Sequence, residues 1–512
     1  MSVSSPLRPA GAVDPAFLVE QFLTSFHRVG RRRQNHGVAI PSASYSTTVR
    51  LEVPADPTSV GRLTTAVGSA GGAVTALDVT ESYTDRIVVD VTCAASDQAH
   101  AEQLTEALRA VEGVRIRKVS DRTFLLHLGG KIEVTSKVPL RNRDDLSMAY
   151  TPGVARVCLA IAAHPEDARR LTIKRNAVAV VTDGSAVLGL GNLGPAAALP
   201  VMEGKVALFK RFADIDAWPI CLDTQDVDEI VRTVQLLAPV FGGINLEDIA
   251  APRCFEVERR LRELLDIPVF HDDQHGTAIV VLAALTNALR VVGKKLADVK
   301  IVLSGAGAAG SAITRLLLAA GAQHLVVCDV DGVLHRARPA LDDNSRWLAA
   351  HTNRAGVSGT LRAALAGADV FIGVSAPAIL TGNDIATMAT GAIVFALANP
   401  DPEVDPAEAR QHAAIVATGR SDEPNQINNV LVFPGVFRGL LDAGAHDISV
   451  EMEAAAALAL ADVLRPDEVN PSFIVPSVFD PEVVRAVADA VRRSVEARPV
   501  PPTQADRELK PT

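Results

Sequence analysis

Apolar and polar positions alternate along this chain with two different periods, and together they predict an α/β protein. Residues 177–182 form an almost unbroken apolar run, typical of a strand buried on both faces of a parallel sheet. Residues 226–237 and 252–265 have the apolar spacing of amphipathic helices, and residues 267–270 form another short apolar strand. We therefore expect an α/β domain over residues 128–290, in which strands and helices alternate after a glycine hinge at residues 129–130.

The same alternation continues in the next part of the chain. Strands are predicted at residues 299–303, 325–328, 370–373 and 393–396, with a helix at 308–320. This pattern predicts a second, doubly wound α/β domain over residues 291–434. Residues 435–498 are mainly helical, and we expect them to pack on the first α/β domain.

An additional small domain is predicted over residues 41–127. Its predicted elements follow the order β-α-β-β-α-β, the split βαβ arrangement of an α+β domain. The pattern resembles an ACT-type regulatory domain, including residues 56–61 at the start of the first helix and Gly71-Gly72 at its end. A ligand-sensing domain and a plain packing or dimerisation domain both remain open. We expect residues 1–40 to be flexible apart from one helix near 17–26, and the Pro-rich tail 499–512 to be mobile.

Composition narrows the class of protein. With 512 residues, 48% hydrophobic and 21% charged, the chain has the composition of several folded domains and not of a disordered protein. A net charge of −10 implies no general affinity for nucleic acid. The five cysteines are widely spaced without a CxxC pair, which favours reduced thiols. No signal-peptide pattern or long uncharged apolar run is present, so we expect a cytoplasmic protein that does not span a membrane.

A glycine-rich run marks a nucleotide site. Gly305, Ala306, Gly307, Ala308 and Gly310 follow a predicted strand and open a predicted helix. Glycines at these positions permit a tight turn and close approach of the backbone to a pyrophosphate, which the helix N-terminus then binds. The second α/β domain is therefore predicted to be a Rossmann-type dinucleotide-binding domain.

The carboxylate that follows this run bears on the choice of coenzyme. Asp329 lies nineteen residues after Gly310 at a predicted strand end, where it can bind ribose hydroxyls. We prefer NAD, because a carboxylate would repel the 2′-phosphate of NADP. His335, Arg336 and Arg338 follow closely and could receive such a phosphate, so NADP remains open.

Four acids stand in apolar sequence. Glu247 and Asp248 follow one apolar run, and Asp272 and Asp273 follow another. Burial of an unpaired carboxylate costs free energy, so we expect these acids to bind a cation. Carboxylate oxygens are ligands that suit Mg²⁺ or Mn²⁺. Each pair taken alone could instead begin a helix, through the helix dipole or as an N-cap.

Several longer motifs occur in one order across residues 130–460 and resemble malic enzymes, of the bacterial type with an N-terminal ACT-like domain. The matching stretches are residues 145–154 (DLSMAYTPGV), 181–194 (VTDGSAVLGLGNLG), 201–205 (VMEGK), 246–249 (LEDI), 271–277 (HDDQHGT), 398–400 (ANP), and 418–422 (TGRSD) through Asn428-Asn429. The resemblance implies oxidative decarboxylation of L-malate to pyruvate and CO₂ with reduction of NAD(P)⁺.

The resemblance also implies roles for individual residues. Glu247, Asp248 and Asp273 would bind the metal. Lys205 would take the proton of the C2 hydroxyl, and Tyr150 would protonate C3. A lysine near a divalent cation can have its pKa lowered enough for this role, and a tyrosine hydroxyl can donate a proton.

Other positions would complete the cleft. By the same resemblance, Asp272 would orient Lys205, and Asn399 and Asn429 would hold the substrate carboxylate. The glycine loop of Gly189, Gly191 and Gly194 would line the cleft near the dinucleotide. The family commonly has an acid where this chain has Asn192, a change that would weaken a contact in this loop without removing activity.

Each of these residues also has a simpler interpretation. Tyr150 could be a packed aromatic of a turn, and Lys205 could be a solvated surface lysine. His271 and His275 flank the acids and could suggest zinc, but we favour packing or support of the metal ligands.

Rival functions follow from the same motifs. An oxaloacetate decarboxylase or a malolactic-type enzyme would use similar residues. A metabolite-sensing protein on an inactive enzyme scaffold would use the ACT-like domain, with a small-molecule effector, as its working part. We also expect a homo-oligomer, from the resemblance and from the general frequency of symmetric assemblies.

Overall fold

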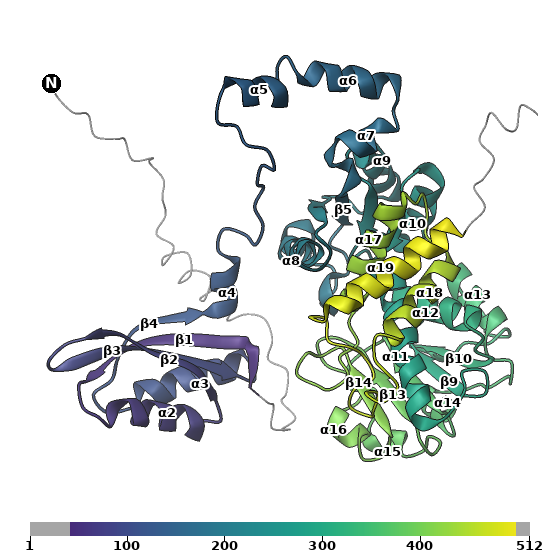
Figure 1. The fold of residues 1–512 in the computed structure, drawn as a ribbon. Helices are drawn as coiled ribbons and strands as arrows, with labels where there is room; N and C mark the ends of the chain where they lie inside the picture. Colours follow the sequence, from purple (N-terminus) through teal and green to yellow (C-terminus); the bar gives the residue numbers. More distant parts are fainter. Residues whose placement is uncertain (1–40, 498–512) are drawn as a thin grey trace, which may run out of the picture. The chain divides into compact units, whose positions relative to one another are not determined.

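The structure, a computed structural model, describes residues 41–497. The chain divides into two compact units, with the boundary between Leu125 and Leu126. The predicted helix near residues 17–26, the flexible N-terminal segment and the mobile tail lie outside the described residues. Figure 1 labels the elements of both units.

The first unit has the predicted β-α-β-β-α-β order. Its sheet is antiparallel with strand order β2-β3-β1-β4. Side chains of alternate strand positions, such as Val49, Leu51 and Val91, are buried together with Leu63 and Leu104 of the two helices. The elements are β1 (Ser42–Pro54), α2 (Ser59–Ser69), β2 (Ala73–Ser82), β3 (Arg86–Ala95), α3 (Gln98–Arg109) and β4 (Arg115–Asp121). The split βαβ fold is confirmed, whereas its ACT identity stays a prediction.

The second unit begins with helices. After α4 (Arg122–His127), which spans the boundary, come α5 (Arg143–Ala149), α6 (Val154–Ala163) and α7 (Asp167–Leu171). The alternation of strands and helices that we expected from residue 130 therefore begins only at residue 177. Residues 131–142 form neither a helix nor a strand, although Ile132 and Val134 alternate with polar residues as in a strand.

A parallel four-stranded sheet follows, with strand order β6-β5-β7-β8. Helices join successive strands, so the carboxyl ends of all four strands meet at one edge. The elements are β5 (Ala177–Thr182), α8 (Pro195–Ala213), β6 (Asp216–Cys221), α9 (Val227–Leu237), β7 (Gly243–Leu246), α10 (Arg253–Leu264) and β8 (Val269–His271).

The next sheet has six strands in the order β11-β10-β9-β12-β13-β14, and only β11 is antiparallel. The order of connection reverses between β9 and β12, which is where such sheets bind ligands. The elements are β9 (Lys300–Ser304), α12 (Ala308–Ala319), β10 (His324–Asp329), β11 (Gly332–Val333), α13 (Asp343–His351), α14 (Leu361–Leu365), β12 (Val370–Gly373), α15 (Gly382–Ile385), β13 (Ile393–Ala396), α16 (Pro406–Ala409) and β14 (Ile415–Thr418).

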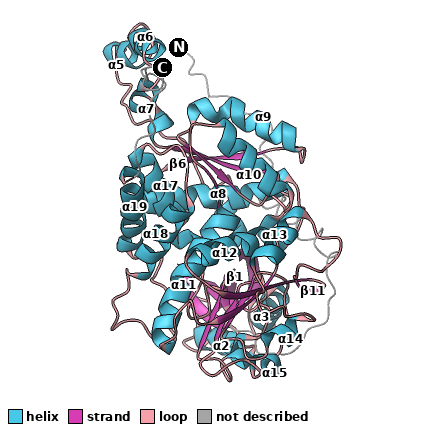
Figure 2. Cartoon of the chain, turned by 90° about the vertical axis from the view of Figure 1, so that its right-hand side faces the viewer, coloured by secondary structure: helices cyan, strands magenta, loops and turns pink. Residues whose placement is uncertain are grey.

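Four helices join the two sheets into one core, namely α11 (Thr277–Val292), α17 (Phe433–Ala443), α18 (Val450–Ala461) and α19 (Pro481–Glu496). Figure 2 shows α19 beside both α17 and α18. Phe433 and Phe437 of α17 pack edge-on against Phe209 of α8, with ring centroids 4.7 and 5.3 Å away. The C-terminal helices thus pack on the four-stranded sheet domain, while α18 also contacts α11 and α12.

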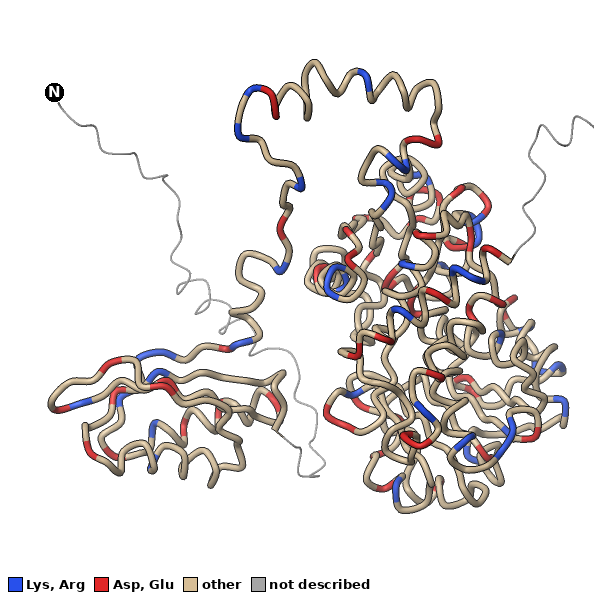
Figure 3. Tube along the Cα trace, viewed as in Figure 1, with Lys and Arg blue, Asp and Glu red and all other residues tan. Residues whose placement is uncertain are grey.

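Among residues 41–497, two helical stretches have the length and hydropathy of a membrane span. The stretch Asp272–Val292 lies largely inside the protein core. The stretch Arg143–Ala163 consists of α5, α6 and the turn between them, and none of its residues is buried. In Figure 3, Lys and Arg are interspersed with Asp and Glu in both units, whereas α6 is almost free of charge.

Candidate metal, substrate and coenzyme sites

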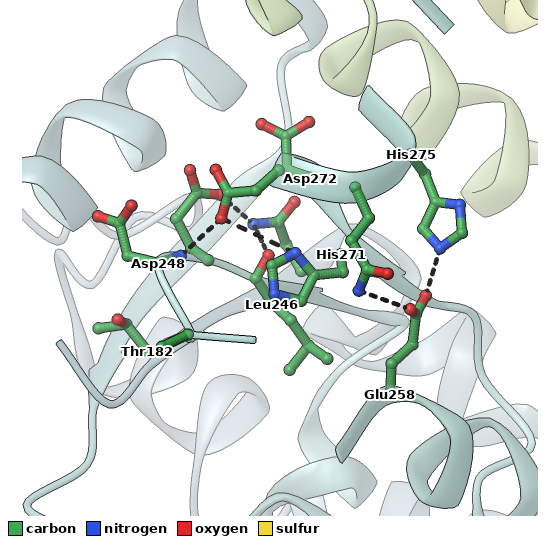
Figure 4. A network of polar contacts seen from close by, with 12 residues as sticks. Thr182, Leu246, Asp248, Glu258, His271, Asp272 and His275 are labelled. Carbon is green, nitrogen blue, oxygen red and sulfur yellow. Dashed lines mark hydrogen bonds and ion pairs between the residues drawn. The ribbon is translucent and has the colours of Figure 1, made fainter. Parts of the chain in front are cut away.

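Three acids meet at the carboxyl edge of the four-stranded sheet. Glu247 and Asp248 follow β7, and Asp273 lies in η5 (Asp272–Gly276), a π-helical turn that follows the neighbouring β8. One carboxylate oxygen from each of the three residues lies within 4.8 Å of the others. Figure 4 shows Asp248 and Asp272 on the side of this network opposite His275. The two sequence segments therefore converge as expected.

An unusual backbone conformation supports the cluster. Asp248 has φ of 54°, in the left-handed region that costs a non-glycine residue about 1 kcal/mol. The surrounding loops hold it there: its N–H donates to Oδ2 of Asp273 at 2.9 Å, and its carbonyl accepts from the N–H of Ala186 at 3.0 Å. Such strain is typical of functional sites.

The acids are crowded and poorly solvated. Burial, with the charge of Asp273, raises the pKa of Glu247 to about 7. Burial and the charges of Asp273 and Glu247 raise the pKa of Asp248 to about 8. Within residues 41–497, Oδ2 of Asp248 is buried without a hydrogen-bond partner. An all-carboxylate donor set with an orphaned oxygen fits a hard divalent cation such as Mg²⁺ or Mn²⁺.

Lys205 lies beside these acids and is buried, so the solvated-lysine interpretation is wrong. Its Nζ pairs with Oδ2 of Asp272 and lies 2.9 Å from Oε1 of Glu247. The ammonium group also lies 4.1 Å from the ring centroid of Phe433. Burial opposes the charged form, but Asp272 and Glu247 outweigh it, so the pKa of Lys205 is raised. The lowered pKa that is predicted for Lys205 beside a bound cation stays a prediction.

Two asparagines lie on the loops around this cluster. Asn399 follows β13, and a Cβ added to Gly419 would lie only 3.1 Å from its Oδ1. A Cβ on Gly189, which has φ of 74°, would lie 2.7 Å from the carbonyl oxygen of Asn399. A Cβ on Gly276 would lie 3.2 Å from Cβ of Asn429. The glycine loop and η5 therefore approach the two asparagines closely.

Tyr150 lies outside this cluster. It follows α5 directly and its surface is 68% exposed, so it is not a packed aromatic of a turn. Figures 1 and 2 show α5 and α6 apart from the four-stranded sheet, at the end of the unit marked by α7. The structure thus brings together every predicted catalytic and metal residue except Tyr150.

The dinucleotide loop has the geometry that its glycines predict. Gly305 has φ of 113°, and a Cβ there would lie 2.5 Å from the carbonyl oxygen of Val374. A Cβ on Gly310 would lie 1.8 Å from the carbonyl oxygen of Gly305. The backbone from Ala306 to Ala308 leads into the N-terminus of α12, which can bind a phosphate.

Asp329 ends β10, as predicted, and is paired. Its Oδ1 accepts from Nη1 of Arg338 at 2.7 Å, and Nη2 of Arg338 lies 2.8 Å from Asp331. Arg336 donates to the carbonyl oxygen of Ala350. Two aspartates thus pair with Arg338, one of the cations that could receive a 2′-phosphate, and the preference for NAD stays a prediction.

Buried groups that we did not predict surround the two histidines. His275 lies between Glu258 of α10 (2.7 Å) and Glu453 of α18 (2.8 Å), and Figure 4 shows its pair with Glu258. Although burial opposes its charged form, the two carboxylates hold the pKa of His275 well above its ordinary value. His271 is fully buried, and burial lowers its pKa to about 4. Nδ1 of His271 lies 3.8 Å from Oδ2 of Asp273, but the ligand group found within residues 41–497 consists of the three acids alone and includes neither histidine.

The signal for these groups was present in the sequence. Glu258 stands in the apolar stripe of Cys254, Val257 and Leu261. A carboxylate at such a helical position faces the core and requires a cationic partner.

Comparison with known proteins identifies the family. Residues 129–262 match the model of the malic enzyme N-terminal domain, and residues 274–496 match that of the malic enzyme NAD-binding domain. These ranges cover well over half of the chain. The chain belongs to the malic enzyme family.

Individual family members are similar over long stretches. The NAD-dependent malic enzyme of Geobacillus stearothermophilus is 56% identical over 457 residues, which are 89% of this chain and 95% of that protein. The bifunctional malic/malolactic enzyme of Bacillus subtilis is 52% identical over 73% of this chain and 93% of its own length. The crystal structure of a Thermotoga maritima NAD-dependent malic enzyme has a TM-score of 0.70 and 48% identity, and covers 73% of this chain and 99% of that one.

These findings confirm the family resemblance and the α/β fold with a Rossmann-type NAD-binding domain. Residues 41–128 lie outside both matched ranges. The two family models match only the second unit, but the 457-residue match to the Geobacillus stearothermophilus enzyme is longer than that unit and therefore extends into the first. The role of the first unit stays a prediction.

Proposed function

We propose that this protein oxidatively decarboxylates L-malate to pyruvate and CO₂ and reduces NAD(P)⁺. The observation that carries the proposal is the buried Lys205, paired with Asp272 and Glu247 at the edge of the carboxylate cluster. A buried lysine in contact with acids that suit a divalent ion is the arrangement that this chemistry needs. Family membership and the named relatives support the same reaction.

Glu247, Asp248 and Asp273 would hold Mg²⁺ or Mn²⁺. When bound, the cation supplies Lewis acidity at the C2 oxygen and enough positive charge to offset the acids, and NAD(P)⁺ accepts the hydride. Lys205 releases its own ammonium proton when the charge of the acids is offset, and its neutral Nζ then takes the proton of the C2 hydroxyl as the hydride leaves C2. Asp272 orients Lys205 through their ion pair.

The remaining residues bind substrate and return a proton. Asn399 and Asn429 hold the substrate carboxylate without adding charge beside three acids. The bond between C3 and the departing carboxyl group then breaks, CO₂ leaves, and C3 of enolpyruvate accepts a proton from the hydroxyl of Tyr150. The glycines at 189, 191 and 194 line the cleft, and the loop from Gly305 to Gly310, with Asp329, binds the dinucleotide.

The proposed role of Tyr150 requires that it reach an active site, because it lies exposed on a segment without buried residues. We propose that a second copy of the chain covers α5 and α6 in a homodimer. Leu146, Met148 and Leu159 are 51%, 70% and 71% exposed, which a soluble monomer would leave in water. Dimerisation would bury this surface and bring Tyr150 to an active site.

Mixed dimers test this assembly. Lys205→Ala and Tyr150→Phe proteins are unfolded together, refolded and assayed. If Tyr150 serves the partner's cleft, each mixed dimer has one intact site, so about one quarter of the parent activity returns, since half of the dimers are mixed. If Tyr150 serves its own cleft, no mixed dimer has an intact site and activity stays absent.

We also propose a division of the chain into working parts. Residues 128–290 and the helices of 435–498 form the substrate and metal domain, and residues 291–434 form the coenzyme domain. Residues 41–127 form an ACT-like domain that takes a small-molecule effector or serves assembly. We place the protein in the cytoplasm, with no membrane or nucleic-acid partner.

A direct assay tests the function. Purified protein is incubated with L-malate, Mn²⁺ and either NAD⁺ or NADP⁺, and the reduced coenzyme and pyruvate are measured. Equal amounts of both products support the proposal, and no reduced coenzyme with either dinucleotide refutes it.

A matched pair of variants tests the role of Lys205. Removing one partner of a buried ion pair costs about 3–5 kcal/mol, so Lys205→Ala alone could fail through instability. Lys205→Arg keeps the positive charge beside Asp272 and Glu247 but cannot release a proton at neutral pH. We expect both variants to lose turnover while Lys205→Arg keeps its fold; retained turnover in either variant would rule out this role.

A second reaction has specific support, because the Bacillus subtilis relative is named as bifunctional malic/malolactic. A malolactic reaction would release lactate and no free reduced coenzyme. Oxaloacetate decarboxylase activity would release pyruvate from oxaloacetate without a dinucleotide. An inactive sensor would release neither product, and product analysis separates all of these.

A further inference from the structure

Glu403 is a fully buried acid that the proposed mechanism does not use. It lies between β13 and α16, at the carboxyl edge of the six-stranded sheet, and none of its surface is exposed. It is absent from the carboxylate cluster that suits a metal. A buried acid of this kind needs a set of hydrogen-bond donors.

The surrounding backbone supplies those donors. Oε1 accepts from the backbone N–H of Ser375 at 2.8 Å and from its hydroxyl at 3.3 Å. Oε2 accepts from the N–H of Ala398 at 3.0 Å. A Cβ on Gly373 would lie 2.6 Å from Oε1, so a glycine is needed there to admit the carboxylate.

These contacts join the loop that carries Asn399 to the strand ends next to the dinucleotide loop. Ala398 directly precedes Asn399, which we assign to the substrate. The hydroxyl of Ser375 lies 3.0 Å from that of Ser304, which directly precedes the dinucleotide loop. The N–H of Val374 also donates to the carbonyl of Ser304 at 2.9 Å. Glu403 is therefore the shared acceptor between the substrate loop and the strand ends that carry the coenzyme loop.

We propose that Glu403 is a positioning residue that sets the separation between Asn399 and the dinucleotide loop, and so aligns C2 of malate for hydride transfer. The proposal rests on the proposed function. Hydride transfer is sensitive to misplacement on the scale of 1 Å. One rigid side chain that spans both loops can limit such displacement.

An amide tests the role with little change in volume. All three groups facing Glu403 donate hydrogen bonds to it, and both of its oxygens are used. Glu403→Gln would present an NH₂ group to at least one N–H donor, so one side of the bridge opens.

The chain offers a matched control at the opposite edge of the same sheet. Asp369 accepts from the N–H of Lys300 at 2.8 Å and from Nζ of Lys294 at 2.7 Å. It thus links the amino ends of β9 and β12, whereas Glu403 acts near their carboxyl ends. Asp369→Asn should lower stability without changing the alignment of substrate and coenzyme.

The experiment compares parent, Glu403→Gln and Asp369→Asn with L-malate and with L-malate deuterated at C2. We expect Glu403→Gln to lower kcat/KM for malate at least tenfold and to raise the deuterium isotope effect on kcat/KM, because hydride transfer becomes slower relative to other steps. Asp369→Asn should keep both values within twofold of the parent. A Glu403→Gln protein with parental kcat/KM, or with a parental isotope effect, overturns the proposal.

Two further outcomes are decisive. If Glu403→Gln does not fold, Ser375→Ala, which removes only the hydroxyl between Glu403 and Ser304, must raise the isotope effect; a parental value overturns the proposal. If the parent protein itself reduces no coenzyme with malate, the proposed function is refuted. If the parent is active and Glu403→Gln behaves like the parent, only the proposed role of Glu403 is refuted.

Discussion

Binding of Mg²⁺ should release protons at low pH and almost none at high pH. In the structure, burial raises the pKa of Glu247 to about 7 and that of Asp248 to about 8. Both groups ordinarily titrate near pH 4, so they are protonated at a pH where a surface acid is not. A cation binds only their ionised forms and must displace these protons.

The magnitude follows from the two values. At pH 6.0 the pair holds about 1.9 protons, and at pH 8.5 it holds about 0.3. Raising the pH over this interval should therefore strengthen Mg²⁺ binding close to 10³-fold, or about 4 kcal/mol. His271 does not contribute, because burial lowers its pKa to about 4 and it is neutral at both pH values.

The same pKa shifts determine whether the free energy of unfolding rises or falls with pH. A carboxyl group whose folded pKa is raised stabilises the fold fully below its unfolded pKa, and this contribution is lost as pH rises through the folded pKa. Without metal, Glu247 and Asp248 should thus weaken the fold progressively between about pH 4 and pH 8. Mg²⁺ should restore more stability at pH 8.5 than at pH 6.0.

Titration calorimetry in buffers of different ionisation enthalpy counts the released protons. The Lys205→Arg protein serves as control, because it keeps the positive charge beside the acids but cannot itself release a proton on metal binding. Fewer than half a proton released at pH 6.0, or an affinity that changes less than tenfold between pH 6.0 and 8.5, would refute the electrostatic description of the cluster.

Two further predictions concern the coenzyme and the backbone. Asp329→Ala should remove the carboxylate that repels a 2′-phosphate and one of the two partners of Arg338, now 2.7 Å from Oδ1 of Asp329, while Asp331 stays paired with it. The ratio of kcat/KM for NADP⁺ over NAD⁺ should rise by about 10–100-fold, and a ratio within threefold of the parent contradicts this. Gly276→Ala should lower kcat at least tenfold and the free energy of unfolding by about 1–3 kcal/mol, because the new Cβ would lie 1.9 Å from Oδ1 of Asp272. Steady-state kinetics measures kcat and thermal unfolding measures stability. Parental values for both quantities would contradict this prediction.

Six strands of the two parallel sheets could be predicted from sequence because they are short and largely apolar. β5, β12 and β13 have the predicted limits, and β8, β9 and β10 differ from theirs by one or two residues. β6, β7, β11 and β14 received no predicted range. The carboxylate cluster could be predicted for a related reason, since parallel strands place their carboxyl ends at one edge.

Other features depend on long-range contacts that periodicity does not contain. Sequence predicted that Asp272 and Asp273 could cap a helix, but not that the turn after them is π-helical. It suggested a lowered pKa for Lys205 beside a cation, but it did not show that Glu247 also pairs with Nζ. The position of Tyr150 outside the cluster follows from the packing of α5 and α6, which propensity does not decide.

The buried acids Glu258, Glu403 and Glu453 share one explanation. Each is held in part by a residue of another element of the chain, namely Gln274 for Glu258, Ser375 for Glu403 and His275 for Glu453. A single sequence shows that such an acid needs a partner but does not show which one. Their roles became visible only when the three-dimensional contacts were known.

The central claim is that Glu247, Asp248 and Asp273 bind one divalent ion beside Lys205. Anomalous diffraction at the manganese edge, from crystals grown with Mn²⁺, tests it most directly. We predict one strong peak at about 2.0–2.4 Å from an oxygen of each of the three carboxylates. A peak that lacks any one of these three ligands, or one that lies elsewhere in the protein, would contradict the account.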